Sequence, residues 1–153
     1  MSHAARWQIL WTCAVRVLVP ALGLLAATDT AATQSRKTVW DGVYAKAQAR
    51  RGLQTYTSVC VYCHGPDLEG DETGPALKGS SFMAQWRDQT VFKLLVKIVE
   101  TMPENNPGSL SPQAAIDVLS FLLEANQIPA GSTDLPTDPA ALEEIFVTER
   151  TTK

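Results

Sequence analysis

The pentapeptide Cys60-Val61-Tyr62-Cys63-His64 constrains what this 153-residue chain can fold into more than any other feature. Two thiols separated by two residues and followed directly by an imidazole form the attachment motif of a c-type haem. One turn of helix, or a tight loop, puts both sulfurs on the same side, within reach of two neighbouring porphyrin vinyl groups, and leaves His64 under the iron. We therefore expect one haem c per chain, bonded to Cys60 and Cys63 and ligated by His64.

Other uses of the same residues have less support. A zinc site needs four ligands of Cys, His or carboxylate type, and the motif supplies only three. A thioredoxin-like cysteine pair would follow a buried strand, whereas the residues before Cys60 have the periodicity of a helix. A disulfide between Cys60 and Cys63 would be strained and would give His64 no role.

The first 32 residues are typical of a signal peptide. Arg6 and Arg16 make the start basic, residues 17–27 form an apolar run, and small residues follow through Ala32, after which we expect cleavage. The run is shorter than the ~20 apolar residues that span a bilayer. The alternative is an uncleaved anchor that reaches back to Ile9 and buries Arg16. We expect a periplasmic protein, with membrane association only if the segment is uncleaved.

The charge balance argues against a nucleic-acid partner. The chain has 13 Lys and Arg against 16 Asp and Glu, a formal net charge of −3 at pH 7, whereas phosphate binding needs a basic face. Cys13 lies in the predicted signal, so the mature chain keeps only the cysteines of the motif. The mature length fits one small domain, in which a haem would form a large part of the core.

Apolar periodicity predicts three main helices. The first covers residues 44–59 and has Gly52 in its middle. A mid-helix glycine lowers stability by roughly 1 kcal/mol relative to alanine, so we expect another helix to approach closely there. The third begins at Pro112 after the N-cap Ser111 and ends near Asn126.

The second predicted helix covers residues 91–101, with Thr90 as its N-cap and a buried stripe of Phe92, Leu95 or Val96, and Val99. Residues 65–81 are rich in Gly, Pro, Asp and Glu and are expected to form a loop. A short helix is expected within residues 138–146, where its apolar side chains can hold the C-terminal tail against the body or contact a partner.

Two residues outside the motif are candidates for contact with the haem or its ligand. Pro75 has no N–H to donate, so a carbonyl near it can accept a hydrogen bond from the second ring nitrogen of His64. Met102 ends the second helix because Pro103 disfavours helical geometry before it, and its thioether can then turn toward a metal. With a haem in the chain, Met102 is the leading candidate for the sixth iron ligand. Its competitor Met83 is expected to pack near the haem edge.

With these helices placed, residues 44–126 resemble the small mono-haem class I cytochromes c. The matching residues are Gly52, Tyr56 and the Cys-x-x-Cys-His motif, then Gly74-Pro75-x-Leu77, Met102, and Val118-Leu119-x-Phe121. The resemblance implies an all-α fold with three main helices wrapped around a covalently bound haem, and it places Pro75 and Leu77 beside the cofactor. It also implies that the first helix crosses the closing helix at Phe121. The expected division is a signal at 1–32, a cytochrome domain at 33–129 and a tail at 130–153.

The chain is also similar to bacterial cytochromes that accompany quinoprotein dehydrogenases, through residues 39–44 and Thr101-Met102-Pro103 with the later Pro107-Gly108-x-Leu110. These resemblances imply a one-electron carrier rather than an enzyme, working between a dehydrogenase donor and a terminal oxidase or another cytochrome of a respiratory chain. One alternative is a haem subunit that stays bound to a quinoprotein dehydrogenase. Another is a five-coordinate haem peroxidase or sensor, in which Met102 does not bind.

Overall fold

The computed structural model describes residues 36–150. The predicted signal peptide, residues 1–32, lies outside the described residues. Residues Gln34–Lys153 form one unit by their internal contacts. Within residues 36–150, no helix has both the length and the apolar character needed to cross a membrane.

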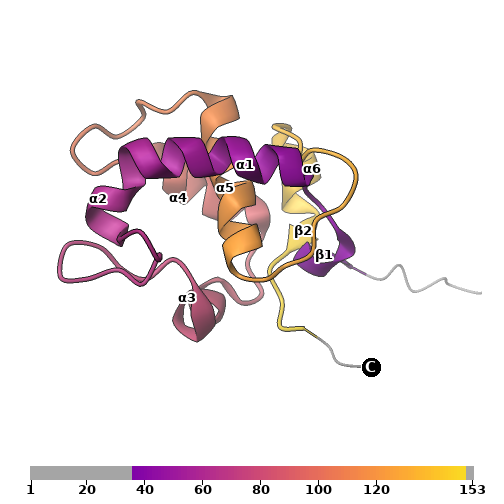
Figure 1. The fold of residues 1–153 in the computed structure, drawn as a ribbon. Coiled ribbons are helices and arrows are strands. Elements are labelled where there is room, and N and C mark those ends of the chain that lie inside the picture. The colour runs from indigo at the N-terminus through magenta and orange to yellow at the C-terminus, as the bar shows by residue number, and fades with distance from the viewer. Residues whose placement is uncertain (1–35, 151–153) are drawn as a thin grey trace, which may run out of the picture. The chain divides into compact units, whose positions relative to one another are not determined.

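The fold is all-α, as predicted, apart from one pair of two-residue strands (Figure 1). The three predicted main helices are present, and α1 and α5 cross near the centre of the molecule. In chain order the elements are β1 (Lys37–Thr38), the 3₁₀ turn η1 (Val39–Asp41), α1 (Lys46–Thr55), the π-helical turn η2 (Tyr56–Cys60), α2 (Val61–His64), α3 (Gly79–Trp86), α4 (Val91–Thr101), α5 (Pro112–Ala125), α6 (Pro139–Glu143) and β2 (Ile145–Phe146).

The predicted first helix, residues 44–59, starts later than expected and changes geometry along its length. It is α-helical through α1, becomes a π turn in η2 and returns to α-helix in α2, which ends at His64. The hydroxyls of Thr57 and Ser58 donate to backbone carbonyls of the preceding turn. A π turn holds more residues than an α turn, so it changes the direction in which the following residues point. The cysteine motif therefore faces a direction that an unbroken helix would not give it.

Gly52 marks the crossing of α1 and α5, and this part of the prediction is confirmed. A Cβ at Gly52 would lie 1.9 Å from the carbonyl oxygen of Asp117 and 2.9 Å from Cβ of Phe121. One turn later, the rings of Tyr56 and Phe121 pack with their centroids 5.1 Å apart and their planes at 51°. The two backbones approach so closely that no side chain fits between them at this position.

The predicted bounds and N-caps of α4 and α5 are confirmed, since the Thr90 and Ser111 hydroxyls accept hydrogen bonds from backbone N–H groups of the first turns. The predicted buried stripe of α4 is wrong. The buried side chains are Val91, Leu94 and Ile98, whereas those of the predicted stripe are only half-buried. Because α4 is apolar on two adjacent faces, periodicity alone did not select the face that meets the core.

Helix α3 was not predicted, and its first turn overlaps the expected loop at residues 65–81. Its buried residues are Phe82 and Trp86, whose ring centroids are 6.4 Å apart. An eight-residue helix with two buried side chains offers little periodicity to detect.

The C-terminal segment contributes to the core. Leu135, Leu142, Ile145 and Val147 are buried, so the prediction that apolar side chains hold this segment against the body is confirmed. The predicted helix at residues 138–146 is shorter than expected, because α6 ends at Glu143 and the next residues form β2. Strand β2 runs parallel to β1, in the register Lys37↔Ile145 and Thr38↔Phe146, and the two ends of the described chain therefore lie together in Figure 1.

Candidate cofactor site

A pocket of about 640 Å³ opens between α2, α3, α4 and α5. This volume lies within the ~300–1,000 Å³ typical of sites for small molecules and cofactors. The lining is mostly apolar and includes Phe82, Leu94, Ile98, Val118 and Leu122. The predicted site residues Cys60, Cys63, His64, Pro75, Leu77 and Met102 all line this one pocket.

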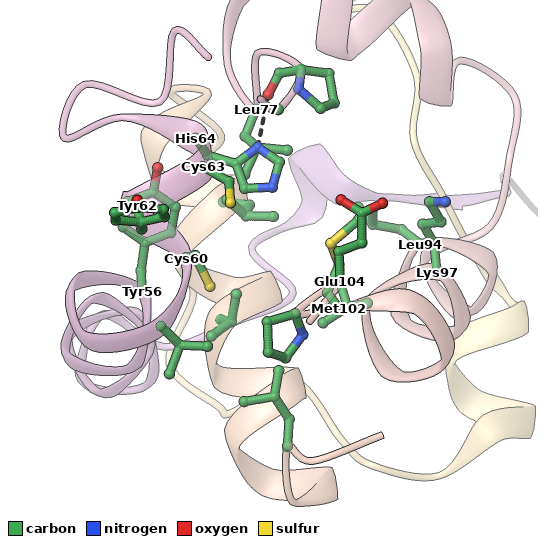
Figure 2. A pocket seen from close by; sticks show the side chains of 18 of the residues that line it. Tyr56, Cys60, Tyr62, Cys63, His64, Leu77, Leu94, Lys97, Met102 and Glu104 are labelled. Atoms are coloured by element: carbon green, nitrogen blue, oxygen red, sulfur yellow. Dashed lines mark hydrogen bonds between the residues drawn. The ribbon is translucent and has the colours of Figure 1, made fainter. Parts of the chain in front are cut away.

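His64 ends α2 and is 7% exposed. Its Nδ1 lies 2.8 Å from the carbonyl oxygen of Pro75, so the hydrogen bond expected from the sequence is present. A carbonyl can only accept, so Nδ1 carries the proton and Nε2 is left with a free lone pair. Figure 2 shows the imidazole on one wall of the pocket, with its hydrogen bond directed away from the cavity. Nε2 is therefore the nitrogen available to a metal.

The loop behind His64 packs tightly enough to fix the ring. A Cβ on Gly74 would lie 2.6 Å from the carbonyl oxygen of Cys63 and 3.1 Å from Nδ1 of His64. The Gly70 N–H donates to the carbonyl of His64 at 3.0 Å, and the Tyr56 hydroxyl donates to the carbonyl of Gly65 at 2.6 Å. Only a residue without a side chain lets the loop approach so closely.

Cys60 and Cys63 are free thiols and are half-buried at the pocket wall. Burial, with a smaller contribution from Cys63, raises the pKa of Cys60 to about 11. Both sulfurs lie on the same wall as His64 (Figure 2). Within residues 36–150, no group of three or more His, Cys, Asp or Glu side chains is arranged to hold a metal ion.

Met102 is the C-cap of α4, with extended backbone angles that turn the chain out of the helix. Figure 2 shows its thioether across the pocket from the His64 imidazole. Met83 is half-buried against the core in α3 and does not line the pocket. Of the two methionines in residues 36–150, Met102 is therefore the one placed to meet a group held by His64.

Several lining residues were missed by sequence reasoning. Phe82 and Trp86 come from the unpredicted helix α3, and Leu94 and Ile98 come from the face of α4 that was assigned wrongly. Lys97 and Glu104 are the charged residues of the lining. The signal that could have found Leu94 and Ile98 is their i, i+4 spacing one position before the chosen stripe.

The residues present fit a c-type haem. Two thiols precede the imidazole at the spacing that covalent attachment needs, the hydrogen bond at Nδ1 leaves Nε2 of His64 facing the pocket, and a soft thioether lies across from it. The remaining lining is mostly apolar, as the faces of a porphyrin require. Fold and site together define the class as c-type cytochromes.

The comparison with protein families agrees with this class. The model of the family described as "Cytochrome C oxidase, cbb3-type, subunit III" matches residues 47–122, from α1 into α5. This segment contains the motif, the loop behind His64, and Met102. The match supports the class of c-type cytochromes, whose members hold haem c covalently and transfer electrons.

Among solved structures, the chain is similar to the crystal structure of the sulfane dehydrogenase SoxCD from Paracoccus pantotrophus, with 18% sequence identity and a TM-score of 0.47. The match covers 71% of this chain and 61% of that chain, so this chain spans about three fifths of its length. No curated protein matches the chain.

Proposed function

We propose that this cytochrome is a periplasmic one-electron carrier that moves electrons between a dehydrogenase and a respiratory acceptor. Cys60 and Cys63 would hold one haem c per chain covalently, His64 and Met102 would ligate its iron, and Pro75 and Leu77 would lie beside it. The observation that carries the proposal is the pair of facing side chains: an imidazole fixed by the Pro75 carbonyl, and a thioether on the opposite wall.

Ligands from both walls favour electron transfer over chemistry on a bound substrate. When bound, haem c supplies an iron centre that gains and loses one electron. With both His64 and Met102 bound to the iron, no ligand position would remain for peroxide or a gas. His64 is the only histidine after residue 3, so the described part of the chain has no second imidazole for acid–base work. A neutral thioether ligand also favours a high reduction potential.

The predicted export signal supports a periplasmic location. A cysteine pair in an oxidising compartment would form a disulfide unless it were used, and haem attachment uses both thiols. The expected partners are redox proteins, with a dehydrogenase as donor and a terminal oxidase or another cytochrome as acceptor. If the chain is instead a tightly bound dehydrogenase subunit, size exclusion of a native extract followed by a haem stain will place the stain at high mass.

The test of the ligand assignment compares two methionine variants. We expect Met102→Ala to abolish the weak sulfur-to-iron charge-transfer band of the oxidised protein and to lower its reduction potential, because the thioether is lost. Met83→Leu is the matched control and should keep both. If Met83→Leu loses the band and Met102→Ala retains it, the assignment of Met102 as the sixth ligand is wrong. The assignment of His64 would remain intact.

The test of covalent attachment is extraction with acidified acetone. Haem bonded to Cys60 and Cys63 should stay with the polypeptide through extraction and through a denaturing gel. Release of the haem into the solvent would contradict the proposal at its first step.

A further inference from the structure

Tyr62 is the most exposed large apolar side chain in the described part of the chain. It is 89% exposed, and Leu53 at 45% is the other large apolar residue exposed within residues 36–150. Tyr62 lies between the two cysteines and also lines the rim of the pocket. The fold gains little from a ring left in water, whereas exposed aromatic side chains are common anchors in protein–protein contacts.

The chain around this rim has almost no basic residues. No Lys or Arg occurs between residues 52 and 77, or between residues 98 and 149. These two stretches supply η2, α2, the loop behind His64, and α5. Lys97 is the one basic residue that lines the pocket.

The loop between α2 and α3, which also supplies residues to the pocket lining, carries negative charge. It carries Asp67, Glu69, Asp71 and Glu72, all exposed, and we call residues 67–72 the acidic loop. Glu69 pairs with Lys78 at 3.4 Å. The other three carboxylates have no Lys or Arg within 4 Å among residues 36–150, so their charge is not neutralised locally.

Hydrogen bonds join the acidic loop to the cysteine motif. Asp71 accepts from the Thr73 N–H at 2.6 Å and from the Thr73 hydroxyl at 2.5 Å. The same hydroxyl lies 3.2 Å from the carbonyl oxygen of Cys63. Thr73 and Tyr62 both line the pocket, so the loop that carries Asp71 and the exposed ring border the same cavity.

We propose that Tyr62 and the acidic loop form a docking surface for a redox protein whose own contact face is basic around an apolar centre. The proposal rests on the proposed electron-transfer function and adds the chemistry of the partner. Opposite charge would steer the two proteins together and orient them, and the Tyr62 ring would supply the apolar contact at the cofactor rim. We expect the interface to bury a small area and the complex to be short-lived, as in other electron-transfer pairs.

The charge at the site is measured first with small oxidants of opposite sign. The reduced protein gives one electron either to tris-phenanthroline cobalt(III), a cation that becomes cobalt(II), or to ferricyanide, an anion that becomes ferrocyanide. We expect added salt to slow the cobalt reaction and to speed the ferricyanide reaction. In the variant Asp71→Asn with Glu72→Gln, both salt dependences should become several-fold weaker.

A matched control separates local charge from net charge. The variant Glu143→Gln with Glu144→Gln removes the same charge from α6, which lies at the far end of α1 from α2 in Figure 1. The salt dependences of this variant should stay close to those of the unmodified protein. Equal effects from the two double variants would overturn the proposal, because the rates would then report net charge alone.

The aromatic contact is measured with a protein probe, a lysine-rich mitochondrial-type cytochrome c. We expect Tyr62→Ser to lower the second-order rate of electron exchange with this basic protein several-fold, and Leu53→Ser, the exposed control outside the pocket rim, to leave it unchanged. Rates are compared after the potential of each variant is measured, so that driving force is accounted for. An unchanged rate in Tyr62→Ser would overturn the role of Tyr62.

The two proposals fail in different ways. A purified chain that holds no haem, or that is not reduced and oxidised reversibly, would contradict the proposed function. A chain that is reversibly reduced and reacts with both oxidants, but shows the same kinetics in all variants, would contradict only the docking surface.

Discussion

Gln48 is a buried side-chain amide that pairs with the backbone as a strand would. The residue is 0% exposed; its Nε2 donates to the carbonyl of Leu135 at 3.0 Å, and its Oε1 accepts from the Leu135 N–H at 2.6 Å. Both backbone groups of Leu135 are thus satisfied by one residue of α1. No apolar pattern in the sequence pointed to this contact.

Replacing this amide with an apolar side chain of similar size should lower the free energy of unfolding. Gln48→Met keeps the approximate shape but leaves a donor and an acceptor of Leu135 buried without partners, so we expect the free energy of unfolding to fall by roughly 2–4 kcal/mol. Urea denaturation followed by circular dichroism measures the change. Gln54→Met, on the exposed side of the same helix, should change stability by less than about 0.5 kcal/mol. If both variants lose similar stability, the pairing of the Gln48 amide with the Leu135 backbone is not the source of the loss.

Tyr44 predicts a pH dependence in the alkaline range. Burial, with a smaller contribution from Glu124, raises its pKa to about 12 from an ordinary value of 10.0, and its hydroxyl donates to the carbonyl of Ile128 at 2.7 Å. The folded state therefore keeps a proton that the unfolded state loses. The stability from this group is complete below about pH 10 and is lost as the pH rises toward about 12.

Tyr44→Phe tests this dependence. The variant should be less stable than the unmodified protein by about 1 kcal/mol at neutral pH, because the Ile128 carbonyl loses its donor. It should also lose less stability than the unmodified protein between about pH 10 and pH 12. The remaining slope is expected from Tyr56, whose pKa burial also raises to about 12. Parallel pH profiles for the two proteins, measured by denaturation at each pH, would contradict the assignment.

At the scale of elements, the contact between α1 and α5 depends on a single missing side chain. Gly52→Ala adds a methyl group that would lie 1.9 Å from the Asp117 carbonyl oxygen, so the helices must separate. Separation also disturbs the ion pair of Arg51 with Asp117, where Nε and Oδ2 are 2.9 Å apart. We expect a net loss of roughly 1–3 kcal/mol, although alanine is by itself the better helix former. Gln54→Ala in the same helix is the control; a stable Gly52→Ala protein would mean that the crossing tolerates a wider spacing.

The sequence was informative where local chemistry is specific. Thr90 and Ser111 mark helix starts, Pro103 marks a helix end, and the motif with Gly74 and Pro75 led to the observed hydrogen bond of His64. These features act over a few residues, so they can be read without knowing the fold. The resemblance to class I cytochromes then identified the closing helix as the one that crosses the first helix at Gly52.

The rest of the site depends on contacts between distant residues. α4 has two apolar faces, and only the positions of α5 and α6 decide that Leu94 and Ile98 turn inward. Helix α3 is held by two buried aromatic residues and has no strong signal of its own. The π turn η2 has no signal in helix propensity, so the sequence alone did not predict it.

At the scale of the whole molecule, residues 130–150 behave as part of the core rather than as an appendage. Leu142 is 0% exposed, and Trp40 Nε1 donates to the carbonyl of Thr148 at 2.7 Å, a contact between residues 108 positions apart. The Val147 N–H also donates to the carbonyl of Gln89 at 2.9 Å. The segment thus joins β1 to the turn before α4.

Leu142→Ala tests whether this segment stabilises the whole fold. We expect the free energy of unfolding to fall by roughly 2–5 kcal/mol in a single transition, because a cavity opens in the shared core. Glu143→Ala, at the exposed neighbouring position, should have little effect. Two separate thermal transitions, with only the weaker one affected by Leu142→Ala, would show that the segment folds as an independent unit.

The pairing of β1 with β2 also sets the order in which the chain can fold. Contacts between residues near 37 and residues near 145 join the two ends of the described chain, and such contacts form late, since loop closure is slow for distant residues. If the chain crosses a membrane N-terminus first, as we propose, β1 crosses before β2. β1 then stays unpaired until β2 has also crossed. Until β1 and β2 pair, we expect Cys60 and Cys63 to be accessible, so that haem attachment would precede the closure of the structure.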